Sequence, residues 1–229
     1  DVIVKWLSDK RGNRVYLHVP KRGEKKKLLE MAARNADEAL QNISENIKRE
    51  EARTKGAVKE LADYLGLNQL PDRIEAFDIS NIQGTDSVAS MVVFEEGKPK
   101  NRDYRRFKIK SVKGPDDFAS MAEVLERRFR RGLEERRELT EQGKSVDDGK
   151  FSRIPDLVLI DGGKGQLNIA VEVIRGLGLN DITVISLAER FEEVYVEGQD
   201  EPVNIPKHSA ALHLLQRIRD EAHRFALNY

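Results

Sequence analysis

A carboxylate, three glycines and a lysine directly follow one short apolar run of this sequence. Residues 157–160 are apolar at every position, which is typical of a strand buried on both faces of a sheet. Asp161 ends the run, and residues 162–165, with Lys164 among them, lead into a helical pattern. Open α/β sheets place ligand sites at the carboxyl ends of strands, and a helix N-terminus beside a lysine suits a phosphate group. Asp161 could instead cap the helix, so a second carboxylate is needed before this turn becomes a site.

The glycine spacing excludes two nucleotide-binding motifs. The turn has neither the Gly-x-x-x-x-Gly-Lys-Ser/Thr of a P-loop nor the Gly-x-Gly-x-x-Gly of a dinucleotide-binding turn. Lys164 could contact a phosphate or neutralise carboxylates, and simple turn chemistry explains it equally well.

The second carboxylate, Asp78, lies on an earlier predicted strand. In chain order we expect strands 73–80, 88–94 and 104–110, a helix from 117, strand 157–160 with its helix, strand 182–187, a hairpin within 192–205, and a final helix from 209. Three antiparallel strands followed by strand–helix units are the order of the ribonuclease H-like fold. In that order the first and fourth strands lie side by side and parallel, so Asp78 and Asp161 should face each other. Residues 71–229 are therefore predicted to be an α/β domain, a ribonuclease H-like mixed sheet flanked by helices.

Residues 1–70 are predicted to be a small appendage on this domain. Alternating apolar residues on either side of a polar turn indicate a β-hairpin over residues 1–20. Apolar positions at helical spacing then indicate helices over residues 28–40 and 42–65, followed by a linker.

The helix from residue 117 carries an apolar stripe and many arginines. The stripe comprises Phe118, Met121, Leu125 and Phe129. Four arginines are expected mostly outside the core: Arg127, Arg128, Arg130 and Arg131. Residues 132–152 are almost entirely polar and are expected to be a frayed helix end and a flexible insertion.

Composition limits the class of protein. The chain has 229 residues, 35% of them charged, which allows one sizeable domain plus an appendage. The absence of cysteine excludes disulfides and thiolate metal sites. No apolar stretch approaches the roughly 20 residues of a membrane span and no signal peptide is visible, so we expect a cytoplasmic protein without a membrane partner. The net charge is zero, so nucleic-acid binding would depend on local basic clusters. The chain begins at Asp1 and is expected to be a piece of a longer protein, monomeric as a fragment.

Several short motifs resemble one known family. They are Phe-Asp-Ile-Ser at 77–80, Tyr-Arg-Arg at 104–106, Leu-Ile-Asp-Gly-Gly-Lys-Gly-Gln at 159–166 and Ile-Arg-Asp-Glu-Ala-His-Arg at 218–224. In this order, and over essentially the whole chain, the sequence resembles the catalytic half of the UvrC family, the incising subunit of bacterial nucleotide excision repair. Full UvrC proteins would also carry a GIY-YIG nuclease domain, a UvrB-binding motif and helix-hairpin-helix repeats, which this sequence does not contain.

The resemblance implies a metal-dependent DNA endonuclease. Such an enzyme cuts damaged duplex DNA on the 5′ side of a lesion once UvrB has marked it. Asp78 and Asp161 match the family's metal-binding catalytic aspartates, and His223 matches the third member of an Asp-Asp-His site. Carboxylate oxygens suit Mg²⁺ or Mn²⁺, and an imidazole either favours Mn²⁺ as a ligand or serves as an acid or base. Without the resemblance, His223 would be interpreted as a rim histidine satisfied by Asp220 or Arg219 on its own helix.

Five other residues have weaker claims. Asp117 matches a functionally implicated aspartate of the family, although an Asp before a helical stripe is more simply an N-cap. Arg105 and Arg106 could grip DNA, although basic residues on a strand are usually just solvated. Asn81 and Gln83 follow Asp78 closely and could touch the scissile strand.

Two other functions stay open at this point. One is a non-catalytic ribonuclease H-like scaffold that docks DNA or a partner, and the intact set of two aspartates and a histidine argues against it. The other is a nucleotide-binding phosphotransferase that uses residues 162–165, and the missing motif spacing argues against that. Metal-dependent nicking separates the nuclease from both.

Overall fold

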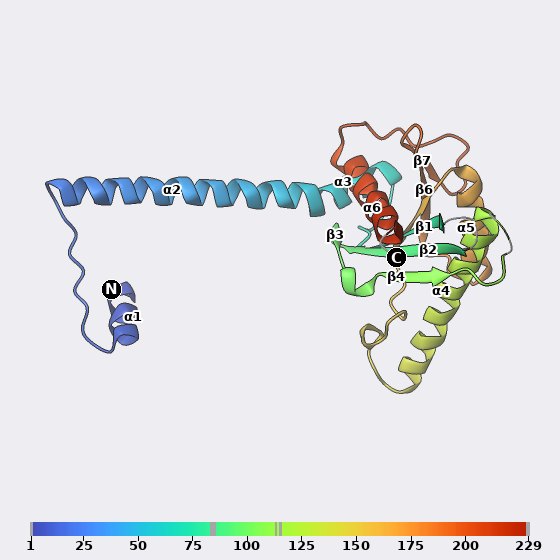
Figure 1. Ribbon diagram of the computed structural model, residues 1–229, viewed down its shortest axis with the longest axis horizontal. Coiled ribbons are helices and arrows are strands. Elements are labelled where there is room, and N and C mark those ends of the chain that lie inside the picture. The colour runs from blue at the N-terminus through green and yellow to red at the C-terminus, as the bar shows by residue number, and fades with distance from the viewer. Residues whose placement is uncertain (1, 83–85, 113, 115, 228–229) are drawn as a thin grey trace. The chain divides into compact units, whose positions relative to one another are not determined.

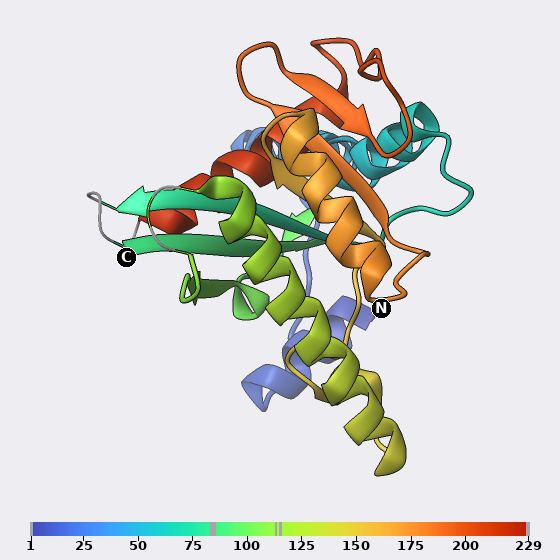
Figure 2. The ribbon, with the colours of Figure 1, turned by 90° about the vertical axis from the view of Figure 1, so that its right-hand side faces the viewer.

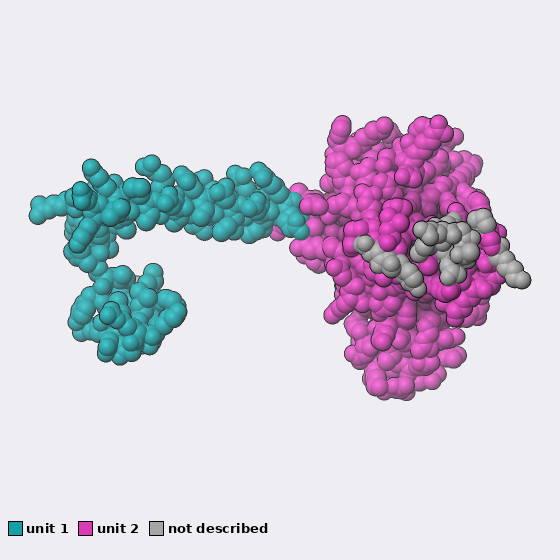
Figure 3. Space-filling model, in the orientation of Figure 1, with its two compact units in different colours: residues 1–50 teal, residues 51–229 magenta. Residues whose placement is uncertain are grey.

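The computed structural model describes residues 2–82, 86–112, 114 and 116–227 of the chain. The chain forms two compact units, Asp1–Glu50 and Glu51–Tyr229, shown in different colours in Figure 3. No helix in the described ranges is both long enough and apolar enough to cross a membrane.

The first unit is helical, and the hairpin predicted over residues 1–20 is wrong. Helix α1 (Val2–Arg11) occupies the first half of that segment, and residues 14–20 form no strand. The predicted hairpin rests on the alternation of Val2 and Val4, but Ile3, Trp6 and Leu7 are spaced for one face of a helix, and basic residues in the last turn suit a helix C-terminus. Gly12 then ends the helix in the left-handed region, with φ of 73°. Helix α2 (Glu24–Glu51) follows and fulfils the helical prediction for residues 28–40.

Helix α3 (Ala57–Leu65) belongs with the second unit, although it was expected in the appendage. A short π-helical turn (Ala52–Gly56) joins it to α2. Ala57, Val58 and Leu61 are buried in the core, which is why the division between units falls at residue 50 and not at residue 70. Gly66, with φ of 64°, ends the helix where the sequence predicted its end.

A mixed sheet is the centre of the second unit. Its strands are β1 (Arg73–Ile82), β2 (Asp86–Glu95), β3 (Lys98–Pro99), β4 (Arg105–Lys108), β5 (Leu157–Asp161), β6 (Thr183–Ala188) and β7 (Glu193–Val196). The order is β3-β2-β1-β5-β6-β7, with β4 also paired to β2. Strands β1, β2 and β4 are antiparallel, whereas β5 runs parallel to β1 and β6 parallel to β5. The predicted ribonuclease H-like arrangement, with the first and fourth long strands side by side, is confirmed.

Helices cover both faces of this sheet (Figures 1 and 2). Helices α4 (Asp117–Glu141) and α5 (Lys164–Gly176) lie on one face, where Phe77 of β1 meets Phe129 of α4 with ring centroids 6.4 Å apart. Helix α6 (Ala210–Leu227) lies on the other face, and the Glu60 carboxylate of α3 accepts a hydrogen bond from the Ala211 N–H at its start. The apolar run of β5 is buried at every position, as predicted.

Helix α4 departs from its sequence pattern in two ways. Met121, Leu125 and Phe129 are buried, but Phe118 is half exposed. The helix also continues in order to Glu141, and the segment that follows is fastened to it, because the Glu135 carboxylate accepts hydrogen bonds from the backbone N–H groups of residues 151 and 152. The predicted fraying of this helix end is therefore wrong.

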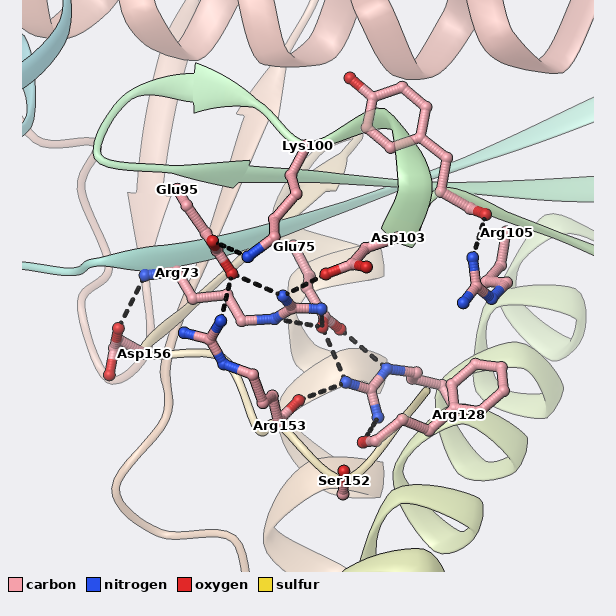
Figure 4. Close-up of polar contacts among 12 residues, drawn as sticks. Arg73, Glu75, Glu95, Lys100, Asp103, Arg105, Arg128, Ser152, Arg153 and Asp156 are labelled. Atoms are coloured by element: carbon pink, nitrogen blue, oxygen red, sulfur yellow. Dashed lines mark hydrogen bonds and ion pairs between the residues drawn. The ribbon is translucent and has the colours of Figure 1, made fainter. Parts of the chain in front are cut away.

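Arg128 of α4 was expected outside the core and is completely buried (Figure 4). Its guanidinium donates to both oxygens of Glu75, at 2.9 and 2.7 Å, and to the carbonyls of Phe151 and Arg153.

Arg73 donates to Glu75 from the other side and also pairs with Glu95 and Asp103. This network ties α4 and the segment before β5 to the amino-terminal end of β1, and so fixes β1 beside β5.

Candidate active site

Asp78 and Asp161 lie one residue beyond the last paired residues of β1 and β5, Phe77 and Ile160. Side chains alternate between the two faces of a sheet, so both carboxylates point away from the face that Phe77 shares with α4. They project toward the face covered by α6. Asp161 is the last residue of β5, whereas Asp78 lies within β1, just past the point where the two strands stop pairing. The structure therefore brings together the two aspartates that the sequence predicted to face each other.

His223 reaches this pair from α6. Its Nδ1 lies 3.4 Å from Oδ2 of Asp78, which is almost buried, while the imidazole itself is 58% exposed. Ser80, two residues along the same strand, donates a hydrogen bond of 3.0 Å to the same oxygen. Asp220, the alternative partner on the helix, instead accepts from Arg219 at 3.1 and 3.0 Å. The interpretation of His223 as a rim residue satisfied within its own helix is therefore wrong.

The electrostatics of the site centre on Asp161. Burial, and after it the nearby negative charges of Asp78 and Glu189, raise the pKa of its carboxyl from 3.8 to about 6. The positive charge of Arg219 and that of His223, when protonated, oppose this shift. Two carboxylates close together in a partly dry site repel each other, so the site favours any cation that neutralises them.

The donor set fits a hard divalent cation in its chemistry. Two carboxylates and an imidazole are ligand types that Mg²⁺ and Mn²⁺ accept. Among the residues that the structure describes, however, no three His, Asp or Glu side chains lie close enough together to form a complete ligand set. Asp78, Asp161 and His223 therefore offer suitable donor types without forming a closed ligand set, and further oxygens would have to come from water or substrate.

The glycine turn after Asp161 is filled by the chain itself. Gly162 has φ of 148°, and a Cβ at this position would lie 1.8 Å from Oε1 of Gln166. That oxygen accepts a hydrogen bond of 3.0 Å from the N–H of Gly163, which is the N-cap residue of α5. The possibility that Asp161 caps the helix is therefore wrong. A backbone donor that a phosphate would need is also already occupied, so the turn lacks the open cradle of a nucleotide-binding loop.

Lys164 points to another part of the chain. Its ammonium forms an ion pair of 2.7 Å with Asp200, which is almost fully exposed, and also donates to the Asp200 carbonyl. A cation paired with a fully solvated carboxylate can exchange that partner for a phosphate at little cost.

Arg105 and Arg106 lie on opposite faces of β4 and have different partners. Arg105 donates to the carbonyls of Arg102 and Tyr104, and its guanidinium lies 5.4 Å from the centroid of the Phe151 ring. Arg106 faces α6 and donates to the carbonyl of Phe225. The two arginines therefore do not form one basic patch.

The remaining predicted residues lie near strand and helix ends. Asp116, not Asp117, is the N-cap of α4, because its side chain accepts from the N–H of Ala119 at 2.9 Å. Asp117 is the first helical residue, where a negative charge suits the helix dipole. Asn81 continues β1 beyond Asp78, and Gln83 lies outside the described residues.

Two residues of the site were missed or misjudged from the sequence. Ser80 lies two positions after Asp78, so the alternation of strand side chains already placed it on the same face. Arg219 lies one helical turn before His223, and its two bonds to Glu192, 3.1 and 3.0 Å, hold it near Asp161. The spacing of four residues on one helix indicated that Arg219 and His223 lie on the same side of α6. It did not indicate the partner of Arg219, Glu192, which lies in a loop outside the helix.

Comparison with known proteins identifies the family. The family model described as the UvrC RNAse H endonuclease domain matches residues 62–227, and that of the UvrC Ribonuclease H-like domain matches residues 1–43. UvrABC system protein C of Clostridium perfringens (strain 13 / Type A) is 49% identical over 231 residues, and that of Symbiobacterium thermophilum 52% over 241 residues. Both alignments cover 100% of this chain but only 37% and 38% of those relatives, so the chain spans less than two fifths of their length.

Among solved structures, endonuclease V of Ciona intestinalis, in complex with a 24mer DNA containing an inosine, matches with a TM-score of 0.36 and 14% identity, covering 82% of this chain and 97% of that one. At those values the likeness supports no statement about function. The family model and the relatives, by contrast, span the carboxylates, the glycine turn and α6. The chain belongs to the UvrC RNase H endonuclease domain family.

Proposed function

We propose that this chain is a metal-dependent endonuclease of nucleotide excision repair, which hydrolyses a phosphodiester on the 5′ side of a lesion in a complex of damaged duplex DNA with UvrB. The family membership supports the nuclease class. The observation that supports the proposal is the contact between His223 and Asp78, whose Nδ1 and Oδ2 atoms lie 3.4 Å apart, with Asp78 on a strand that pairs with the strand carrying Asp161. The substrate would be DNA in the cytoplasm, and the reaction would need no membrane.

Asp78, Asp161 and His223 would hold the Mg²⁺ or Mn²⁺ ion. Such an ion supplies Lewis-acid polarisation of the phosphate oxygens and offsets the charge that develops on them. The carboxylates contribute their negative charge, and Ser80 fixes the rotamer of Asp78 by its hydrogen bond to Oδ2. Without a cation, burial and then the nearby charge of Asp78 raise the pKa of Asp161, so ionising this carboxyl beside Asp78 is unfavourable.

His223 has a second capability in this arrangement. Its ring is more than half exposed although Nδ1 faces Asp78, so the rest of the ring is accessible to solvent or substrate. A neutral imidazole in that position can accept a proton from water or return one to a leaving group. Whether His223 acts as a metal ligand or transfers a proton, its ring must stay beside Asp78.

The test is incision of a lesion-containing duplex in the presence of UvrB, in Mn²⁺, in Mg²⁺ and with a chelator. We expect nicking that requires the metal and is lost in Asp161→Ala and His223→Ala. Glu126→Gln is a matched control, because it neutralises an exposed carboxylate of α4 that pairs only with its neighbour Arg130 among the contacts described. Nicking that survives the chelator, or that survives both site substitutions at the wild-type rate, would refute the proposal.

A further inference from the structure

A row of polar side chains crosses three neighbouring strands beneath α6. Asp78 of β1 pairs in register with Ser90 of β2, and Ser90 pairs with Arg106 of β4. Residues directly opposite each other in neighbouring strands project to the same face of a sheet. A carboxylate, a hydroxyl and a guanidinium therefore point together at one stretch of α6.

Each member of this row contacts the same turn of the helix. Asp78 faces the ring of His223. The buried Ser90 donates a hydrogen bond of 2.8 Å to the carbonyl of Ala222, the residue before the histidine. Arg106 donates twice to the carbonyl of Phe225, two residues after it, from Nε at 3.1 Å and from Nη2 at 2.6 Å.

The Arg106 contact places a charged donor on a carbonyl in the last described turn of α6, which runs to Leu227. Hydrogen bonds from a charged donor are stronger than those between neutral groups. Arg106 therefore attaches this turn of the helix to β4.

The aromatic ring of Phe225 strengthens this attachment. The Arg106 guanidinium lies 3.9 Å from the ring centroid, and the Tyr104 ring packs edge-on against the same ring, with centroids 5.1 Å apart. Arginine over an aromatic face is an attractive contact in addition to the hydrogen bonds.

We propose that Ser90 and Arg106 are positioning residues that clamp the last turns of α6 and thereby hold His223 against Asp78. The inference rests on the proposed function, since it assigns these two residues to the histidine of that site. It also gives Arg106 a role different from the DNA contact expected from the sequence. The clamp acts on backbone carbonyls on both sides of His223. It therefore fixes the position of the His223 backbone and the direction in which its ring points.

The first measurement follows the His223 ring in metal-free protein by NMR of histidine-labelled samples, with its signal identified by its loss in His223→Ala. We expect Arg106→Ala to move that signal toward the position of an unstructured histidine and to speed amide exchange at residues 224–227 by at least about tenfold, since fraying opens the last turn. Ser90→Ala should cause a smaller change. Arg106→Lys should restore part of the wild-type position, because lysine keeps the charge and one donor but loses the planar stack.

Arg105→Ala is the matched control for the ring signal. It removes the same charge from the adjacent residue of β4, but its contacts are on the opposite face, with Phe151 and two loop carbonyls. We expect it to leave the His223 signal unchanged. If the signal is unaffected by Arg106→Ala and by Ser90→Ala, the positioning role is refuted, and melting curves of both variants establish that they are folded.

The second measurement is incision by the same variants. We expect Arg106→Ala to lower kcat about 10- to 100-fold with little change in KM, as for a misplaced catalytic group. A change in KM and salt dependence with an unmoved His223 signal would instead make Arg106 a DNA contact and overturn the inference. A displaced His223 ring together with wild-type incision would uphold the clamp and refute the role of His223 in cutting.

Discussion

Replacing Asp161 by Asn should make the metal-free protein more stable at neutral pH. In the folded protein, burial and the neighbouring Asp78 raise the pKa of Asp161 from 3.8 to about 6. A carboxyl with a raised pKa contributes its full stability only below its unfolded value, near pH 3.8, and loses that contribution as the pH rises through about 6. The ionised carboxylate therefore destabilises the fold above pH 6, and asparagine removes this charge with almost no change of shape.

The magnitude follows from the shift. At about 1.4 kcal/mol for each pH unit, a pKa that rises from 3.8 to about 6 corresponds to at most about 3 kcal/mol. Asp161 is only partly buried and water screens its charge, so we expect Asp161→Asn to gain about 1–2 kcal/mol at pH 7.5. The gain should shrink steadily toward pH 4, where the folded protein carries a protonated Asp161.

The assay is urea unfolding in the presence of a chelator between pH 4 and pH 8. Far-UV circular dichroism is the suitable probe, because the single tryptophan, Trp6, is exposed in α1 of the other unit and does not report on the sheet. Asp181→Asn, which alters an exposed carboxylate in the turn before β6, is the control and should leave the free energy of unfolding unchanged.

Mn²⁺ should reverse the order of stability, so that the wild type becomes more stable than Asp161→Asn. A ligand stabilises the folded state that it binds, and more so the tighter it binds; the wild type has one more negative donor than Asp161→Asn. A variant that is no more stable than the wild type at pH 7.5 without metal would refute the reasoning. So would a gain that is the same at pH 4.5 and pH 7.5, since repulsion between ionised carboxylates could not be its cause.

Three further predictions concern other residues of the domain. Asp78→Ala should abolish incision while circular dichroism shows an intact fold, since it removes a donor and also relieves repulsion between the two carboxylates; incision at the wild-type rate would exclude Asp78 from the site. Glu75→Leu leaves the buried Arg128 without its carboxylate and should cost about 3–5 kcal/mol in urea unfolding, whereas combining it with Arg128→Met should recover most of that loss. Equal losses in the single and double variants would contradict this account of the pair. Asp200→Asn should release Lys164 for a phosphate and steepen the log–log salt dependence of DNA binding by up to about 0.9, measured by fluorescence anisotropy; an unchanged slope would show that Lys164 meets no phosphate.

The fold and the two aspartates could be predicted because local patterns define them. The apolar run of β5, the turn residues after Asp161 and the alternation along β1 are properties of short segments, and each depends on only a few neighbours in sequence. The parallel pairing of β1 with β5 then follows from the order of the elements along the chain. Prediction failed in α1, because this short apolar segment contains positions spaced for a strand, Val2 and Val4, and others spaced for a helix, Ile3, Trp6 and Leu7. No long-range contact distinguishes the two in sequence.

The partners of the polar residues could not be predicted, because periodicity tells which face a side chain takes but not what lies opposite. Arg127 and Arg128 are adjacent arginines on one helix, yet the first pairs at the surface with Glu123 and the second is buried against Glu75. The same holds for Arg105 and Arg106, which face different helices and loops.

The sequence by itself thus determined the order of strands and helices, the placement of Asp78 on one strand and of Asp161 at the carboxyl end of another, and the presence of a histidine on the last helix. Only the tertiary structure decided that His223 meets Asp78 and that the charge of Asp78 raises the pKa of Asp161. It also decided that Ser90 and Arg106 hold the helix carbonyls on either side of His223. The physical reason is that hydrogen bonds and charges act over a few ångströms between residues that are far apart in the sequence, and their energies depend on burial that no local pattern records.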